Sequence, residues 1–443
     1  LDTDVDLYIS SSGIFNTDVR NTALDFTVGR QPVPITDPYG GVDVRNELGI
    51  GYLVTPSGYG EDVDVEFGIG TTYDTESNLD VDFSIATSAM FNYETEVFAS
   101  TISGTAVATP WYDGSWSYRQ KITIDYTRVV ANHTDFPVAI RIFGSNEVFT
   151  KSLGSGNDIL FTDSLHNKLS HELSRFEVGN EELLAYVKTD LSSSVNTVLY
   201  MYYGNSFASD QSDMDNAWAS HYRGAYHFEE SSGSLLDSSG NSRDSDVESG
   251  VTRDQPGLLG GNSWAFNSGD YVQINQAKGL VITGNTARTV TAYMYPTTNE
   301  GGQNAWSSLI VIGDGAGGLR SWMLSVDNAG ECSPSQSIGI HYWGTNTCTG
   351  KTLTNIGINQ WHQYAGTHNG SNAQRVFLNG NFEGSSSYTL NTVNTNAYIG
   401  RRVAQTSFAF VGRIGEIRVS DSNLGDAWIE TEYNNMLRAN SGL

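Results

Sequence analysis

The sequence predicts an all-β protein built from tandem β-sandwich domains, and three observations support this fold class. Short segments of alternating apolar and polar residues recur along the chain, separated by Gly, Pro, Asn and Ser. This pattern is typical of antiparallel strands that bury one face. The composition, rich in Gly, Ser, Thr, Asn and Tyr, is that of a β-rich extracellular protein. A chain of 443 residues has room for about two to four domains.

The net charge restricts the partners that this chain can bind. It carries 50 acidic and 24 basic residues, a formal charge of −26. Nucleic acid is excluded because its phosphates need a basic footprint. We expect no membrane insertion, because no run approaches 18 apolar residues. The chain has no signal peptide and does not begin with Met, which fits a processed or partial product.

Residues 1–104 form an acidic block with 18 acidic and three basic residues. A degenerate repeat runs through the block as DVDLYIS at 4–10, DVDVEFGI at 62–69 and DVDFSIA at 80–86. The alternation predicts antiparallel strands. We expect a β-rich domain for attachment or assembly, with protein partners or other copies of the chain binding through it. The segment TAVATP at 105–110 is the expected linker.

The stretch EDVDVEFGIG at 61–70 places Asp62, Asp64 and Glu66 at alternate positions. Side chains at such positions share one face of a strand. The acidic pattern thins out in the other two copies of the repeat, whereas the apolar half persists. We interpret these residues as a solvated charged face, which discourages edge-to-edge pairing of strands. A divalent-cation site is the alternative.

Residues 111–222 contain strand-like runs such as YRQKITIDY, FPVAIRIF and NTVLYMYYG, which predict a β-sandwich adaptor domain. Residues 223–443 contain many short strands at regular spacing, including a tight hairpin turn at NGN, 379–381. The single convincing helix is DAWIETEYNNMLRAN at 426–440, although its apolar residues do not form a clean stripe.

Residues 223–438 carry four motifs in order that resemble laminin-G-like modules of the concanavalin A-like lectin/glucanase class. The resemblance implies a concanavalin A-like jelly roll. The motifs are AYHFEESSGSLLDSSGNSRD, AFNSGDYVQI, WHQYAGTHNGSNAQRVFLNGN and FVGRIGEIRVSDSNLGDAWIETEYNN.

Residues 115–220 resemble an uncharacterised prokaryotic β-rich family that often precedes such modules. The segments that carry this resemblance include SWSYRQKITID and GNDILFTDSLHNKLSHEL. That family has no assigned chemistry. The pairing implies a secreted or surface protein, of a virion or of a cell.

Cys332 and Cys348 are the two cysteines of the chain and lie in one Gly/Ser/Asn-rich segment. We expect a hairpin to bring them together as a disulfide, which implies an oxidising, extracellular setting. A zinc site would need more soft ligands than this pair and His341.

The resemblance to laminin-G-like modules implies a structural calcium near the DSSGN loop and a later strand. The matching residues are Asp237, Asn241, Asp244 and Glu416, and Gly415 stands where the family usually has Asp. Their hard oxygens suit calcium. The alternative is an Asx-type turn, in which Asp237 and Asn241 satisfy local backbone amides.

Glycan recognition needs aromatic faces beside planar polar groups, because the apolar face of a pyranose stacks on a ring while its hydroxyls form hydrogen bonds. The candidate residues lie in loop-like segments and are His341, Tyr342, Trp343, Trp306 and Arg401. The alternative is that Trp306 and Trp343 pack beneath long loops.

No catalytic residue is expected. Glucanases of the resembled class carry an E-x-D-x-E strand, and residues 223–443 contain none. The chain also lacks a G-x-S-x-G elbow and an HExxH motif. The sequence therefore predicts an extracellular, non-catalytic surface protein that binds polysaccharide or glycoconjugate. Two alternatives remain: a virion structural protein with little affinity for sugar, and a polysaccharide-degrading glycoside hydrolase.

Overall fold

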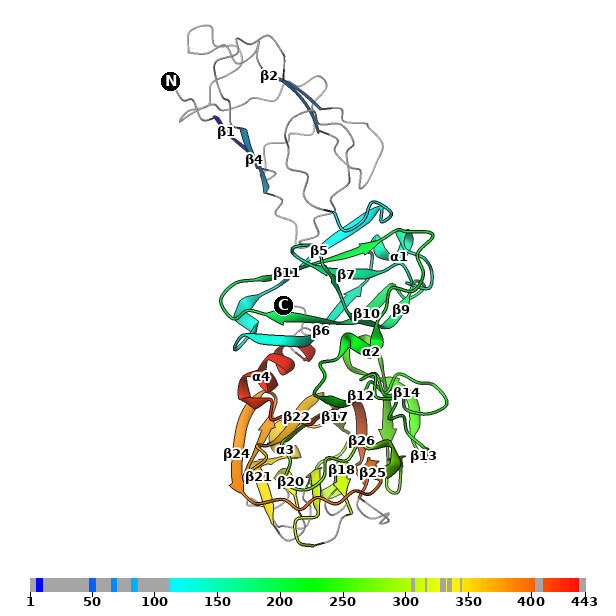
Figure 1. Ribbon diagram of the computed structural model, residues 1–443, viewed down its shortest axis with the longest axis vertical. Helices are drawn as coiled ribbons and strands as arrows, with labels where there is room; N and C mark the ends of the chain where they lie inside the picture. The colour runs from blue at the N-terminus through cyan, green and yellow to red at the C-terminus, as the bar shows by residue number, and fades with distance from the viewer. Residues whose placement is uncertain are drawn as a thin grey trace. The chain divides into compact units, whose positions relative to one another are not determined.

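The computed structural model (Figure 1) describes four strands near the N-terminus and most of the chain after residue 110. It divides the chain into two compact units, Leu1–Asn92 and Tyr93–Leu443. None of the described helices is long and apolar enough to cross a membrane. The described residues are 5–10, 48–52, 65–69, 81–86 and 111–437, the last range with gaps at 304–306, 315–316, 327–331, 333–336, 343–344 and 403–408.

The first unit shows how the repeat pairs. Strand β1 (Val5–Ser10) lies parallel to β4 (Val81–Ala86), with Val5 opposite Val81 and Ile9 opposite Ile85. Antiparallel pairing was expected, and it is wrong here because alternation specifies which face is buried but not the strand direction. Strands β2 (Leu48–Tyr52) and β3 (Val65–Ile69) do pair antiparallel. Of the carboxylate stretch, Glu66 lies on β3, whereas Asp62, Asp64 and the linker 105–110 fall outside the described residues.

The middle part of the chain forms a β-sandwich of two sheets around one apolar core, with short helices in its loops. One sheet has the order β5 (Tyr118–Ile124), β11 (Thr197–Tyr203), β7 (Leu160–Asp163), β8 (Lys168–Leu169), and the other has the order β6 (His133–Phe143), β10 (Glu182–Leu191), β9 (His171–Glu177). The helices are η2 (Tyr126–Arg128), α1 (Val148–Lys151) and α2 (Met214–Ala217).

The C-terminal part forms a larger sandwich, which confirms the all-β prediction and its jelly-roll character. Its first sheet has the order β14 (Thr252–Pro256), β15 (Asn262–Phe266), β26 (Gly412–Ser420), β17 (Arg288–Pro296), β22 (His362–His368), β23 (Ala373–Leu378), β24 (Asn381–Ser387), and β12 (Tyr222–Tyr226) also pairs with β26. Its second sheet has the order β13 (Val247–Ser249), β16 (Tyr271–Ile274), β25 (Ala397–Ile399), β18 (Ser307–Gly313), β19 (Ser321–Val326), β20 (Ser337–His341), β21 (Asn346–Thr352). The helices are η3 (Leu258–Gly260), η4 (Gln276–Lys278), η5 (Glu300–Gly302), α3 (Leu353–Ile356) and α4 (Gly425–Met436).

The two sheets of the larger sandwich approach closely because small residues face large ones. Gly366 on β22 faces Trp322 of the opposite sheet, which is fully buried. A Cβ atom at Gly366 would lie 2.8 Å from the Trp322 ring and 2.7 Å from Ile340. Any larger residue at this position would therefore push the sheets apart.

The predicted C-terminal helix is confirmed as α4, and it is buried on two sides. Ile429 packs with Ala365 and Phe377 of the C-terminal sandwich. On another side, the Trp428 ring lies 4.7 Å from the ring of Phe136 in the middle sandwich. A helix covered in this way has no single apolar stripe, which explains the irregular sequence pattern.

A cluster of buried charged side chains joins the two sandwiches. His227 Nε2 lies 3.3 Å from the Glu172 carboxylate on β9, and His227 Nδ1 lies 2.7 Å from the Glu416 carboxylate. Arg418 Nε donates to Glu416 at 2.8 Å, and its Nη1 lies 3.7 Å from Glu432 of α4. All five side chains are less than a tenth exposed.

The charges of this cluster support each other. Burial alone would lower the pKa of His227, but the carboxylates of Glu416 and Glu172 outweigh it and hold that pKa well above its ordinary value. Burial would raise the pKa of Glu416, but His227 and Arg418 hold it below its ordinary value. Both shifts favour the protonated, cationic form of His227 between two carboxylates.

The expected disulfide is confirmed. Cys332 and Cys348 are 16 positions apart in the sequence, and their sulfur atoms are 2.00 Å apart. Cys348 lies on β21, so the bridge attaches the segment before β20 to this edge strand.

Replacing both cysteines by serine should lower the free energy of unfolding by about 3 kcal/mol. Without the bridge the unfolded chain has more conformational entropy, so folding must give up more of it. Denaturant unfolding of the double variant measures the change. Wild-type protein treated with reductant should reproduce it, and an unchanged unfolding midpoint under reduction would contradict the stabilising role.

His227 should make stability depend on pH on the alkaline side. Because its folded-state pKa is raised, its contribution is complete below about pH 6.5, the ordinary value for His, and is lost as the pH rises through the folded-state pKa. The variant His227→Gln should lose this alkaline decline and be less stable at pH 6 by about 3–5 kcal/mol.

His221→Gln is the matched control, since burial lowers rather than raises the pKa of His221. It should keep the alkaline decline. Urea unfolding between pH 6 and pH 10 measures both variants, and an identical pH profile for wild type and His227→Gln would disprove the charged state of His227.

Candidate functional site

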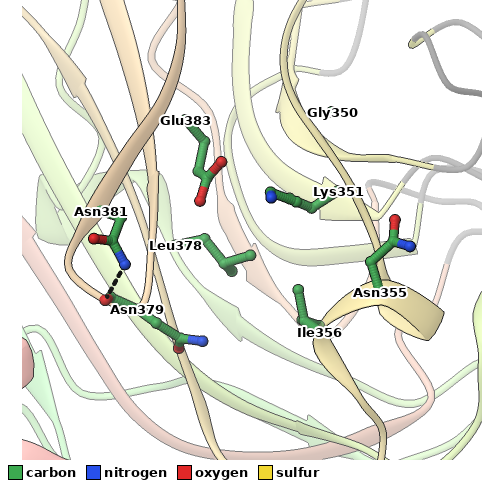
Figure 2. Close-up of a pocket in the computed structure, with 8 residues that line it drawn as sticks. All are labelled: Gly350, Lys351, Asn355, Ile356, Leu378, Asn379, Asn381 and Glu383. Atoms are coloured by element: carbon green, nitrogen blue, oxygen red, sulfur yellow. Dashed lines mark hydrogen bonds between the residues drawn. The ribbon is translucent and has the colours of Figure 1, made fainter.

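A groove opens where β21 and β24, the edge strands of the two sheets, come together. Its cavity has a volume of about 400 Å³ (Figure 2). The lining residues are Gly350, Lys351, Asn355, Ile356, Leu378, Asn379, Asn381 and Glu383.

One wall of the groove comes from β21 and the short helix α3. Lys351 lies on the strand and Asn355 in the helix, which begins after Thr352. The Thr352 hydroxyl accepts the Asn355 backbone N–H at 3.2 Å, while Asn355 Oδ1 accepts the Thr352 N–H at 3.0 Å. This reciprocal capping fixes where α3 begins and so where Asn355 stands.

The other wall is the β23–β24 hairpin. Asn379 and Gly380 form its turn, with φ of 50° and 78°. Asn379 Oδ1 accepts the N–H of Gln363 at 3.0 Å, and Asn381 Nδ2 donates to the Asn379 carbonyl at 3.0 Å. Glycine is favoured at the second turn position, because φ there is positive and a Cβ atom would lie 3.0 Å from the ring of Tyr433 on α4.

The turn is tied to the buried charge cluster through Gln363. Gln363 Oε1 accepts the Gly380 N–H at 3.0 Å, and Gln363 Nε2 donates to Tyr293 at 3.3 Å. The Tyr293 hydroxyl in turn donates to Glu432 at 3.2 Å. A continuous set of hydrogen bonds therefore positions the groove wall relative to helix α4.

The groove combines polar groups with an apolar floor. Figure 2 shows Lys351 and Glu383 extending toward each other from opposite walls. Burial raises the pKa of Glu383, and Lys351 partly opposes this shift. Amides donate and accept hydrogen bonds, a carboxylate accepts them and an ammonium donates them. Together with Ile356 and Leu378, these groups can hold a molecule with many hydroxyls and an apolar face.

The structure does not bring the predicted glycan-binding residues together. His341 and Tyr342 are buried, at 2% and 0% exposure, so neither offers a face to a ligand. The Gly/Asn-rich composition suggested a loop, but β20 is buried along its whole length and ends at His341. Trp306 and Trp343 lie outside the described residues.

Arg401 stands apart from the groove. Its guanidinium lies 3.6 Å from the ring centre of Tyr271 and donates to the Gly269 carbonyl at 3.1 Å. The groove could not be predicted from the sequence because its walls come from separate segments. The NGN turn at 379–381 was recognised, but only the fold places Lys351 and Asn355 opposite it.

The four residues considered for calcium do not form one ligand set. Asp237 accepts backbone N–H groups of Ala225 and Ser239 at Oδ1, and that of Arg243 at Oδ2, each at 3.0 Å. This is the Asx-type arrangement. Asp244 Oδ1 accepts the Asp237 N–H at 2.8 Å.

Asn241 and Glu416 are also engaged elsewhere. Asn241 Nδ2 donates to the Tyr222 carbonyl at 3.0 Å, and Glu416 belongs to the buried charge cluster. Among the described residues, no group of three or more His, Cys, Asp or Glu side chains is arranged to hold a metal ion. The donor set therefore does not fit a calcium cage built from these four residues.

Two family models match the chain. Residues 266–430 match the concanavalin A-like lectin/glucanases superfamily, and residues 155–243 match a domain of unknown function, DUF2341. Both resemblances drawn from the motifs are therefore confirmed. The second match extends past residue 222, where the sequence placed the domain boundary, and includes β12 and the DSSGN loop. No curated protein matches the chain.

Several solved structures are similar at low identity. Domain 4 of AbnA, a GH43 extracellular arabinanase from Geobacillus stearothermophilus in complex with arabinotriose, has a TM-score of 0.37 and 15% identity over 48% of this chain and 97% of that chain. The binding domain of Paraclostridial Mosquitocidal Protein 1 has a TM-score of 0.38 and 15% identity over 48% of this chain and 52% of that chain. The botulinum neurotoxin serotype G binding domain has a TM-score of 0.36 and 16% identity over 48% and 50%.

At TM-scores and identities this low, these likenesses carry no inference about function, and the classification rests on the family models. Residues 266–430 match the concanavalin A-like lectin/glucanases superfamily, and the DUF2341 match at 155–243 precedes them in the same chain.

Proposed function

We propose that this chain is a non-catalytic glycan-binding protein of an extracellular surface, and that it binds through the groove between β21 and β24. One observation carries the proposal: the edge of a concanavalin A-like sandwich presents three asparagine amides, Lys351 and Glu383 around an apolar floor. Planar amides and charged groups bond sugar hydroxyls, and aliphatic side chains accept the C–H face of a ring.

Two further features narrow the ligand and the activity. Glu383 is the single carboxylate among the groove's lining residues, whereas glycosidases generally place two carboxyl groups around the scissile bond. Non-catalytic binding therefore fits better than hydrolysis. The net charge of −26 repels polyanions at long range, which favours a neutral oligosaccharide.

The cellular setting and the front block remain proposals. A disulfide persists in oxidising compartments, so the Cys332–Cys348 bridge supports an extracellular location on a virion or a cell. Assembly through residues 1–104, with protein partners or with other copies, rests on the acidic repeat alone.

Neutral oligosaccharides should bind the wild-type chain, and Asn355→Ala or Glu383→Gln should weaken binding by about five- to tenfold, the effect of one lost hydrogen bond. Asn394→Ala is the matched control, because Asn394 is exposed on the same sandwich and does not line the groove. Glycan-array screening followed by isothermal titration measures the affinities.

If both groove variants bind oligosaccharide as tightly as the wild-type chain does, the binding site lies elsewhere. Absence of binding across neutral and acidic glycans would refute the proposed function. Release of reducing ends from any polysaccharide of the panel would show hydrolysis instead.

Calcium at the DSSGN loop would need a ligand set other than the four residues named above, and Asp237 provides the test of whether calcium or hydrogen bonds hold this loop. Asp237→Ala removes the acceptor of three backbone N–H groups, so we expect a loss of about 1–3 kcal/mol per unsatisfied buried donor. Thermal unfolding with calcium and with chelator measures it. If the loop is held by hydrogen bonds, chelator leaves the wild-type unfolding temperature unchanged; if it is held by calcium, chelator reproduces the effect of the variant.

A further inference from the structure

Helix α4 makes specific polar contacts to the middle sandwich. Asn435 Oδ1 accepts the Ala139 N–H at 2.8 Å, and its Nδ2 donates to the Ala139 carbonyl at 2.9 Å. Ala139 lies on β6, the edge strand of its sheet. The Asn435 amide therefore pairs with this edge as a neighbouring strand would.

The residues around Asn435 add to this docking contact. The Thr431 hydroxyl accepts the Val130 N–H at 3.0 Å and contacts His133 Nε2 at 2.9 Å. Asn434 Nδ2 donates to the Arg128 carbonyl at 2.9 Å. The sequence EYNN at 432–435, which ends the laminin-G-like motif, thus contacts the preceding domain with both asparagines. Figure 1 shows α4 next to β6 of that domain.

The middle sandwich also covers the buried charges of β26. Tyr186 and Trp218 lie over the Arg418 guanidinium, with ring centres 5.5 and 5.0 Å from its central carbon. Glu172 accepts from Trp218 Nε1 at 2.9 Å and from the Ser238 hydroxyl at 2.8 Å. Without this cover, water would reach Arg418 and its partners, which are now almost fully buried.

A second ionic contact crosses the same interface. Arg175 of β9 lies 2.9 Å from Glu229 and donates to the Leu259 carbonyl at 2.8 Å. Leu259 belongs to the C-terminal sandwich, and Glu229 follows β12, which pairs with β26 of that sandwich. The DUF2341 match itself extends to residue 243 and contains β12, which pairs with β26. The part of this chain that matches DUF2341 therefore supplies a strand to the lectin-like sheet.

We propose that the middle sandwich, which contains most of the DUF2341 match, is an intramolecular cap: it completes the C-terminal sandwich, contacts helix α4 through β6, and folds and unfolds with the C-terminal sandwich as one unit. It has a structural role in this chain, beyond that of the adaptor expected from the sequence. This proposal is independent of the glycan groove.

Hydrogen-exchange mass spectrometry of the full chain tests the cap. Asn435→Ala and Glu172→Gln should each speed amide exchange by on the order of tenfold in β6 and β10 and, together with them, in β26 and α4. Asp426→Asn is the control on the same helix, because Asp426 pairs with Arg375 inside the C-terminal sandwich. It should leave β6 and β10 unchanged.

The wild-type chain gives a second readout that does not depend on any variant folding. Its two sandwiches should lose protection at the same denaturant concentration. Separate transitions for β10 and β26 in the wild-type chain, or faster exchange confined to one sandwich in both variants, would overturn the cap.

Discussion

The rest of this structure depends on one buried ionic cluster. In it, His227 pairs with Glu172 and Glu416, and Arg418 pairs with Glu416 and Glu432. Burying these charges is costly, and removing one partner of such a pair typically costs about 3–5 kcal/mol. These ion pairs form only when β9, β26 and α4 are all in place. Through Tyr293 and Gln363 it is also linked to the turn that forms one wall of the groove. The same ionic cluster therefore stabilises both the docking of the two sandwiches and the geometry of the groove.

Features with a local signal could be predicted from the sequence. Period-2 alternation and turn residues indicated the strands, the four ordered motifs indicated the concanavalin A-like domain, and one shared segment indicated the Cys332–Cys348 disulfide. The helix at the C-terminus was also recognised. Pairing direction was not, because the repeat has the same apolar spacing in both directions, and β1 and β4 pair parallel in register.

Features that depend on tertiary contact could not be predicted. His341 and Tyr342 were assigned to a binding rim because their segment is rich in Gly and Asn, yet β20 buries them. Glu416 was considered as a calcium ligand, but its neighbours in space, His227 and Arg418, make it part of an ionic cluster. The groove joins segments about thirty residues apart. Neither composition nor spacing predicts that Lys351 and Glu383 line the same groove, because only the packing of the two sheets brings them together.

The protonation state of His227 in the intact chain is the most direct test of the buried cluster, and nitrogen chemical shifts of labelled histidine measure it across the pH range. Both ring nitrogens of His227 should remain protonated well above pH 6.5, because two buried carboxylates hold the proton. The variant Glu416→Gln should lower the midpoint of that titration. A wild-type His227 that titrates near its ordinary value of about 6.5 would contradict the buried cluster, and with it the shared support of the cap and the groove.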